Sequence, residues 1–298
     1  MIECIPNFSE GRRLDVVQKL VSAMTQTPEV RVLDWSADID HNRSVITCVG
    51  TPDGLSKGLQ ACFQVALEHM PMEAHQGQHP RLGSVDVIPF VPLAGSTMAH
   101  CVELAHRVGA ELADRFSVPV YYYEEAALRP ERRNLADVRA GNYEGLKSSI
   151  DQPERRPDAG PTKLHPVLGA VAVGARPPLI AYNILLGTSQ INVARAVAKR
   201  VRARDGGLAS VKAMAVAPSA RPAVQVSMNL VDFNRSAMYT VFEMVRMEAR
   251  RYGVPVVGSE VVGLVPLEAL VEVARYYLRL EGFKTSQVLE SHLLGEWL

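Results

Sequence analysis

The first half of the chain switches repeatedly between apolar residues at helical spacing and short runs of β-branched residues. Apolar residues spaced three or four apart are typical of one helix face, whereas a run of four to eight apolar residues indicates a strand. The pattern predicts strands at 2–6, 30–35, 44–50 and 85–91, and helices beginning at residue 14 and near residue 52. This order, β-α-β-β-α-β, is the ferredoxin-like unit. A helix over 97–116 and a strand over 118–123 extend it.

The second half repeats this architecture without a residue-by-residue match to the first. Strands are predicted at 178–186, 211–217, 223–231 and 254–257, helices over 190–203 and 236–252, and two further helices after Pro266. Residues 124–160 show little periodicity and predict a surface excursion with at most short helices. We therefore predict an α/β (α+β) protein of two ferredoxin-like subdomains, residues 1–178 and 179–298, each a sheet covered by helices.

Composition and charge exclude several classes of protein. Lys plus Arg equals Asp plus Glu at 32 each, which argues against a broad nucleic-acid or membrane-surface partner. No apolar run reaches membrane-spanning length, and the N-terminus lacks the pattern of a signal peptide. The four cysteines are scattered without a Cys-x-x-Cys pair, as expected of small buried hydrophobes in a reducing compartment. We expect a soluble, cytoplasmic protein.

The loop at residues 75–83, His-Gln-Gly-Gln-His-Pro-Arg-Leu-Gly, carries the densest candidate chemistry. Two histidines four apart share a helix face and suit zinc, but Gly77 and Pro80 disfavour a helix here. We therefore predict no metal site. Instead, the loop is expected to present His79 and Arg81 at the mouth of a sheet, where catalytic groups are commonly found. The alternative is a surface loop with incidental histidines.

A second polar loop precedes the third predicted strand. In a β-α-β-β-α-β sheet the first and third strands are the central pair, so this loop should lie at the rim where Asn7 ends the first strand. Carboxylates, an imidazole and a guanidinium together are typical of a general acid/base site for an anionic substrate. The loop residues concerned are Asp38, Asp40, His41, Asn42 and Arg43. Turn chemistry is the alternative for the two aspartates, and topology alone leaves open whether His79 reaches this rim.

A third candidate is the loop Gly160-Pro161-Thr162-Lys163-Leu164-His165-Pro166-Val167-Leu168-Gly169. Its glycines and prolines predict a shaped loop near the domain boundary, a common place for a ligand; a rigid linker is the alternative. The spacing Gly-x4-Gly-Lys-Ser/Thr is lacking, and so is Gly-x-Gly-x2-Gly. The sequence therefore predicts no nucleotide cofactor.

Several long motifs resemble the glutamate formiminotransferase family over nearly the whole chain. They include the segments at 3–11, 40–45, 77–83, 118–121, 139–141, 174–176, 182–183 and 256–266. The resemblance implies transfer of a formimino group from N-formimino-L-glutamate to N5 of tetrahydrofolate, in histidine degradation, with a formyl donor as a variant. It also implies a homodimer and a ligand tunnel between the two subdomains. Tetrahydrofolate is then a co-substrate, and no nucleic acid or membrane is expected as a partner.

The resemblance also implies roles for single residues. The family's catalytic histidine falls on His79, and its folate-binding loop on residues 160–169, where 162–165 and 167–168 depart from the animal pattern. An aspartate of the animal relatives is Ser36 here, so Asp38 or Asp40 is expected to orient His79, with the choice left open.

Substrate contacts are expected from the two polar loops and the first turn. The residues concerned are Asn7, Glu10, His41, Asn42, Arg43 and Arg81, with Glu260 a further candidate. The two arginines suit carboxylates because a guanidinium binds them through two hydrogen bonds, whereas a cap or turn role is the alternative for Asn7, Glu10 and Glu260. A single imidazole with a pKa of about 6.5 could serve as both base and acid.

Two functional expectations concern the chain as a whole. Animal relatives fuse this domain to a cyclodeaminase, whereas this chain ends at Leu298. We therefore expect that second activity to be absent and 5-formiminotetrahydrofolate to be released. The competing function is a non-catalytic folate-binding module, which would not require an acid/base.

Overall fold

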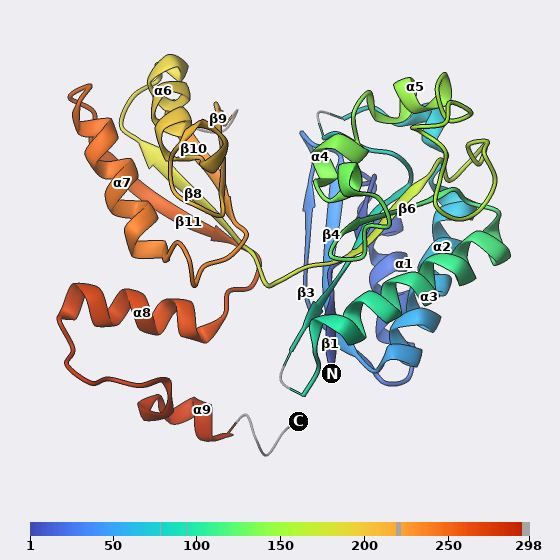
Figure 1. Ribbon diagram of the computed structural model, residues 1–298, viewed down its shortest axis with the longest axis horizontal. Helices are drawn as coiled ribbons and strands as arrows, with labels where there is room; N and C mark the ends of the chain where they lie inside the picture. The colour runs from blue at the N-terminus through green and yellow to red at the C-terminus, as the bar shows by residue number, and fades with distance from the viewer. Residues whose placement is uncertain (78, 94, 219–221, 294–298) are drawn as a thin grey trace. The chain divides into compact units, whose positions relative to one another are not determined.

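A computed structural model describes residues 1–77, 79–93, 95–218 and 222–293 (Figure 1). Gln78, part of the His79 loop motif, lies outside these ranges. The chain forms two compact units, Met1–Pro177 and Pro178–Leu298. Within the described ranges, no helix combines the length and the hydropathy needed to cross a bilayer.

The first unit is built on a seven-stranded sheet with the order β3-β4-β1/β2-β5-β7-β6. Its strands are β1 (Ile2–Cys4), β2 (Asn7–Phe8), β3 (Val30–Asp38), β4 (Arg43–Gly50), β5 (Val85–Pro92), β6 (Val120–Glu124) and β7 (Val171–Ala175). The first four positions are antiparallel neighbours in ferredoxin-like order, which confirms the predicted topology. The strand predicted at 2–6 is divided in two at Ile5–Pro6, where proline has no N–H to donate to the sheet.

Strand β7 was not predicted from the sequence. It pairs in parallel with both β5 and β6, and all five of its residues are buried. Its composition, Val-Ala-Val-Gly-Ala, is rich in residue types that are depleted in strands. A Cβ on Gly174 would lie 2.6 Å from the ring of Tyr123. The strand therefore needs small residues for packing, which weakens its signal in the sequence.

Three helices cover one face of this sheet: α1 (Leu14–Thr25), α2 (Pro52–His69) and α3 (Met98–Phe116) (Figure 1). Their buried faces form the main core with strand residues such as Phe8, Ile46 and Phe90. The side chains of Thr51 and Thr97 cap the first turns of α2 and α3, as preferred at helix N-termini.

Residues 124–160 contain only short helices, as predicted, but they also bury a second small core. The helices are η2 (Pro130–Arg132), α4 (Leu135–Val138) and α5 (Asn142–Lys147). Val138, Leu146 and Ile150 pack with Tyr121 and Tyr123 of β6. Because these apolar contacts anchor the excursion to the sheet, α4 and α5 can position polar groups at its edge.

The second unit is a four-stranded sheet of order β11-β8-β10-β9 with two helices packed into its core. Its elements are β8 (Ile180–Leu186), α6 (Ile191–Val201), β9 (Val211–Val216), β10 (Val224–Leu230), α7 (Met238–Arg250) and β11 (Val256–Val262). This confirms the second ferredoxin-like unit. Strand β11 runs to residue 262 rather than 257, with a register shift between Val256 and Gly258. The helices α8 (Leu267–Leu278) and α9 (Leu289–Leu293) follow.

Candidate active site

Asn42 joins the two polar loops to the turn after β2. It has a left-handed backbone (φ 48°) directly before β4, a conformation that asparagine tolerates. Its Oδ1 accepts a hydrogen bond from the Gly11 N–H at 2.9 Å, and its Nδ2 donates to the Gln76 carbonyl at 2.9 Å. Its own carbonyl lies 3.0 Å from Nε2 of His75. The 36–43 and 75–83 loops therefore meet at one rim, which topology alone left open.

His79 lies in this rim with its side chain 14% exposed. Its Nε2 is 2.8 Å from NH1 of Arg43, at the start of β4. A guanidinium can only donate hydrogen bonds, so Nε2 must accept and the ring proton must be on Nδ1. The Nδ1 atom lies 3.9 Å from Oδ2 of Asp86, on β5. His79 is thus placed between a guanidinium and a carboxylate.

The surroundings of His79 strongly favour its neutral form. Burial, followed by the charges of Arg43 and Arg139, lowers the pKa of His79 to about 2; His41 and His75 act in the same direction. Burial disfavours the charged imidazolium, and neighbouring cations repel it. The free imidazole is therefore a much weaker base than the unperturbed pKa of about 6.5 led us to expect.

Asp86 supplies the carboxylate nearest to the ring, and sequence analysis did not assign it to the site. It is 2% exposed, its Oδ1 accepts the Leu82 N–H at 2.8 Å, and its Oδ2 pairs with Arg139, which follows α4. A signal was present in the sequence: an aspartate within the apolar run Val85-Asp86-Val87. A carboxylate buried in a strand needs a charged or hydrogen-bonding partner. The identity of that partner, 53 residues away, is set by the fold.

The aspartates that sequence analysis proposed as orienting groups are placed differently. Asp38 accepts the His41 backbone N–H at 2.8 Å, and its Oδ2 lies 3.1 Å from Nδ1 of His41. Its side chain is 54% exposed. Asp40 lies in the turn between β3 and β4. The structure thus pairs Asp38 with His41, whose ring centroid is 6.4 Å from that of His79.

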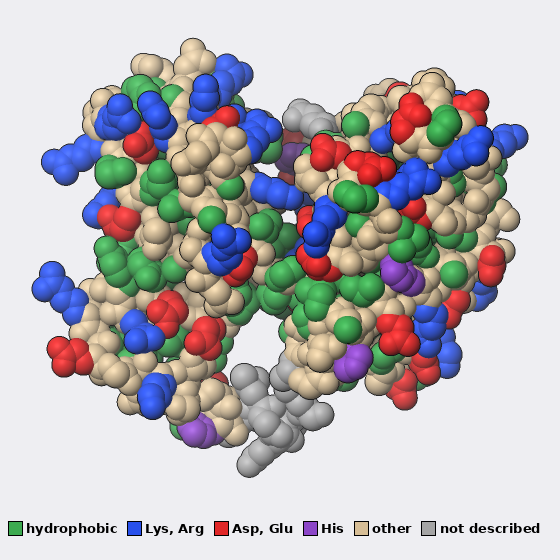
Figure 2. All heavy atoms as spheres, in the orientation of Figure 1, with side chains coloured by type: hydrophobic (Ala, Val, Ile, Leu, Met, Phe, Trp, Pro, Cys, Tyr) green, Lys and Arg blue, Asp and Glu red, His purple; other side chains and the backbone are tan. Residues whose placement is uncertain are grey.

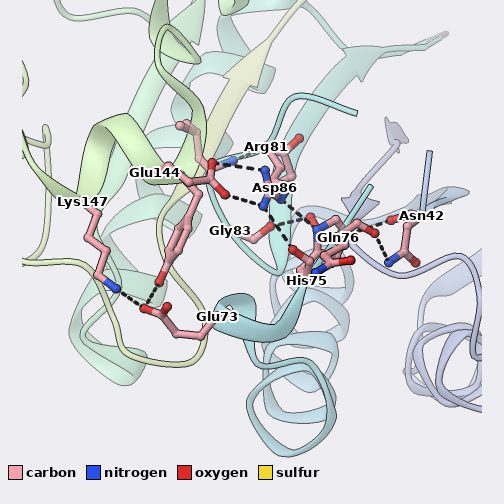
Figure 3. Close-up of polar contacts among 12 residues, drawn as sticks. Asn42, Glu73, His75, Gln76, Arg81, Gly83, Asp86, Glu144 and Lys147 are labelled. Carbon is pink, nitrogen blue, oxygen red and sulfur yellow. Dashed lines mark hydrogen bonds and ion pairs between the residues drawn. The ribbon is translucent and has the colours of Figure 1, made fainter. Parts of the chain in front are cut away.

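Arg81 is held within the chain by contacts that Figure 3 displays. Its Nε donates to Nδ1 of His75 at 2.8 Å, and its NH2 donates to Oε1 of Glu144, on α5, at 2.7 Å. Next to this pair, Glu73 accepts the Tyr143 hydroxyl at 2.8 Å and pairs with Lys147. These contacts tie α5 to the loop that carries His79. Arg81 therefore positions the loop, whereas its expected contact with substrate remains a prediction.

Two further predicted contact residues have local partners. The Oε1 atom of Glu10 accepts the backbone N–H groups of Arg12 and Arg13, each at 2.9 Å, just before α1. This corresponds to the alternative cap role. The Nδ2 of Asn7 donates to the Ile5 carbonyl at 2.8 Å. A cavity of about 310 Å³ lies beside Glu10, and Asn42, Met72 and His75 are also among its lining residues.

The 160–169 loop is joined by backbone hydrogen bonds to the segment that follows His79. The Nδ1 of His165 accepts the N–H groups of Val167 and Leu168 at 3.1 and 3.0 Å, which shapes the turn. The Leu168 carbonyl accepts the Ser84 N–H at 2.9 Å, and Ala170 donates to Leu82 at 3.1 Å. The predicted folate loop therefore meets the loop that carries the predicted catalytic histidine.

The described residues contain no group of three or more His, Cys, Asp or Glu side chains suited to a metal ion. On the face drawn in Figure 2, Lys and Arg side chains are interspersed with Asp and Glu side chains.

Comparison with known proteins assigns the chain to a family. Residues 1–176 match the model of the N-terminal subdomain of the formiminotransferase domain, and residues 181–293 match the formiminotransferase domain model. Glutamate formimidoyltransferase of Streptococcus pyogenes serotype M1 is 45% identical, with 99% of each chain covered. The enzyme of that name from Thermoplasma acidophilum is 45% identical, with 97% of this chain and 96% of the relative covered.

A longer relative matches over part of its length. Formimidoyltransferase-cyclodeaminase of Rattus norvegicus is 42% identical over 93% of this chain and 52% of its own. Two family models together span most of the chain, and the Streptococcus pyogenes relative matches it from end to end. The chain therefore belongs to the formiminotransferase family.

Proposed function

We propose that this protein is a glutamate formimidoyltransferase that transfers the formimino group of N-formimino-L-glutamate to N5 of tetrahydrofolate. The products are 5-formiminotetrahydrofolate and L-glutamate. The observation that carries this proposal is the neutral imidazole of His79, held between Arg43 and Asp86 in a loop that is hydrogen-bonded to residues 167–170. The relatives named glutamate formimidoyltransferase support the choice of substrates.

The transfer requires two proton movements on nitrogen. The N5 lone pair attacks the formimino carbon, an N5–C bond forms, and the π pair of the C=N bond moves onto the imine nitrogen. N5 then loses its proton. The bond from carbon to the glutamate nitrogen breaks as the C=N bond re-forms, and that nitrogen leaves as an amine after gaining a proton. One imidazole can perform both transfers, with a contribution of about 100- to 10,000-fold to the rate.

His79 is the acid/base in this proposal, acting through Nε2. Asp86 orients the ring by attracting the Nδ1 proton, and its negative charge stabilises the imidazolium formed during the transfer. We assign this role to Asp86, and not to Asp38 or Asp40, because its carboxylate lies 3.9 Å from Nδ1 of His79. Arg43 binds a carboxylate of the donor, and Asn42 and His75 position the loops. Residues 160–169 bind tetrahydrofolate, and positioning both substrates supplies further acceleration.

The remaining expectations belong to the same proposal. They are a homodimer, a cytoplasmic location, activity without a metal, and a place in histidine degradation. Use of a formyl donor at the same site is a variant of the reaction. A non-catalytic folate-binding module is the competing function, and the buried positioning of His79 by a charged pair disfavours it, since binding alone needs no such imidazole.

A direct assay tests the proposal. The purified protein is mixed with tetrahydrofolate and N-formimino-L-glutamate, and released glutamate is measured. We expect turnover that His79→Gln lowers about 100- to 10,000-fold, with unchanged circular dichroism. The matched control is His69→Gln, on α2, which removes a partly exposed histidine that contacts Lys19. No glutamate release, with folate bound, would favour the binding module.

A further inference from the structure

The Nε2 lone pair of His79 is occupied by Arg43. A neutral imidazole has one nitrogen that accepts a proton and one that carries a proton. In His79 the accepting nitrogen is Nε2, which receives the hydrogen bond from NH1 of Arg43 at 2.8 Å. While this contact holds, His79 cannot take a proton from N5 of a folate. In the free protein, the nitrogen expected to act as the base is therefore blocked by its hydrogen bond from Arg43; below we call this nitrogen covered.

Charged groups reach His79 from several elements. They are Arg43 from β4, His41 from the preceding turn, His75 from the loop after η1 (Met72–Ala74), Asp86 from β5, and Arg139 from the segment after α4. The charge of Asp86 is compensated by Arg139. Arg43 is largely buried. The carboxylates of Asp86 and Asp38 favour its charge, but among the described residues neither lies within ion-pair distance of the guanidinium. A mostly desolvated guanidinium in this position favours an added anion.

We propose that Arg43 makes the Nε2 lone pair of His79 available only when the donor brings a carboxylate. This inference rests on the proposed function and adds a specificity role for Arg43. The donor carboxylate binds the guanidinium and draws it away from the ring. A charge-assisted, two-pronged bond to a carboxylate is stronger than a single bond to a neutral imidazole. The exchange therefore favours uncovering of Nε2 next to the reacting group.

The role proposed for Arg43 differs from carboxylate binding alone. If Arg43 only bound the donor carboxylate, its replacement would not change the rate of transfer from an amidine that has no carboxylate. A residue that also covers the base would suppress reaction with such an amidine, because nothing then draws the guanidinium away. Formamidine, HN=CH–NH2, carries the same transferable group without a carboxylate and separates the two roles.

The first experiment follows the ring nitrogens of His79 by NMR in ¹⁵N-histidine-labelled full-length protein, with His79→Gln used for assignment. In the free protein His79 should stay neutral down to the lowest pH at which the protein is folded. L-glutamate, the product, should raise its pKa by about 1 to 3 units. Arg43→Gln should show the raised pKa without glutamate and no further response to it. Arg107→Gln is the matched control. It removes a cation on α3 that pairs with Asp53 on α2, among the helices that cover the sheet.

The second experiment measures formimino transfer from formamidine to tetrahydrofolate. Arg43→Gln should raise this rate about tenfold over that of the wild-type protein while raising KM for N-formimino-L-glutamate. Arg43→Lys keeps a positive charge, so the rate of transfer from formamidine should stay low in this variant. It replaces Arg43→Gln as the test if the glutamine variant folds poorly.

The outcomes separate this inference from the proposed function. If the protein turns over N-formimino-L-glutamate but Arg43→Gln leaves the rate with formamidine unchanged, Arg43 does not cover the base. The proposed transferase activity then stands. A His79 titration that bound glutamate does not alter, with binding verified by calorimetry, also overturns the covering role. Absence of both glutamate binding and turnover removes the proposed function, and this inference with it.

Discussion

Gly83 and Gly169 pair as backbone segments in an antiparallel bridge. A Cβ on Gly83 would lie 2.1 Å from the Ala170 carbonyl oxygen and 2.3 Å from that of Leu168. Gly169 has φ of 72°, a conformation that side chains disfavour. The contact joins the loop proposed to bind folate to the loop that carries His79. Glycine at both positions is therefore a packing requirement of the proposed active site.

Gly83→Ala is expected to lower the free energy of unfolding by about 2 kcal/mol or more, because the added carbon overlaps backbone atoms that cannot rotate away. Urea denaturation measures the change. Gly145→Ala is the matched control: it lies in α5 with open space around its Cβ position, and alanine should stabilise that helix by up to about 1 kcal/mol. Equal effects of the two changes would contradict the close packing at Gly83.

Asp86→Asn is expected to lower the free energy of unfolding by about 3 kcal/mol, because the largely buried side chain of Arg139 loses its partner charge. It should also lower kcat by about 100-fold, because the Nδ1 proton loses its carboxylate. A purely structural effect would lower the free energy of unfolding but leave kcat of the folded protein unchanged. Measuring kcat under conditions where circular dichroism shows the variant to be folded therefore tests the positioning role.

Asp38→Asn decides between the two orienting carboxylates. Asp38 is exposed and pairs with His41, so its loss should change the free energy of unfolding by less than about 1 kcal/mol. Its effect on kcat should be much smaller than that of Asp86→Asn. A loss of kcat as large as for Asp86→Asn, with the folded state intact, would return the orienting role to Asp38.

The stability of the protein should depend on pH through His79. Its pKa is about 2 in the folded protein and about 6.5 in the unfolded chain. Between these values the unfolded chain holds a proton that the folded protein lacks. The contribution of His79 to the free energy of unfolding is therefore complete above about pH 6.5. As the pH falls below that value it is lost at about 1.4 kcal/mol per pH unit. His79→Gln should accordingly show a shallower decline in unfolding free energy from about pH 6 to pH 4. If urea titrations show the same decline in unfolding free energy for the wild-type protein and His79→Gln, His79 is not the source of this pH dependence.

His165→Ala is expected to weaken binding of 5-formyltetrahydrofolate by about tenfold, because two backbone N–H groups in the 160–169 loop lose their acceptor. Calorimetric titration measures the affinity. His165→Asn should recover part of it, because an asparagine oxygen can accept a backbone N–H two residues further on. If His165→Ala leaves the affinity for 5-formyltetrahydrofolate unchanged, the turn that His165 shapes does not contribute to folate binding.

Much of the fold could be predicted from the order of apolar patterns. Alternating strand-like and helix-like segments produce β-α-β-β-α-β in each half, and both sheets have the corresponding strand order. The prediction failed at β7, where close packing against Tyr123 calls for small residues. Such a segment lacks the bulky β-branched pattern that distinguishes a strand in a sequence.

The sequence by itself determined the family motifs, the two repeated units, and the candidate loops around His79 and residues 160–169. Only the tertiary structure decided which groups touch the imidazole. The polar loop before β4 and the family resemblance favoured Asp38 and Asp40 as orienting carboxylates, yet Asp86 lies nearest to Nδ1 of His79. Strand β2 pairs with both β4 and β5, so Arg43 and Asp86 lie on either side of one rim. The low pKa of His79 follows from that burial and those charges, which chain order does not encode.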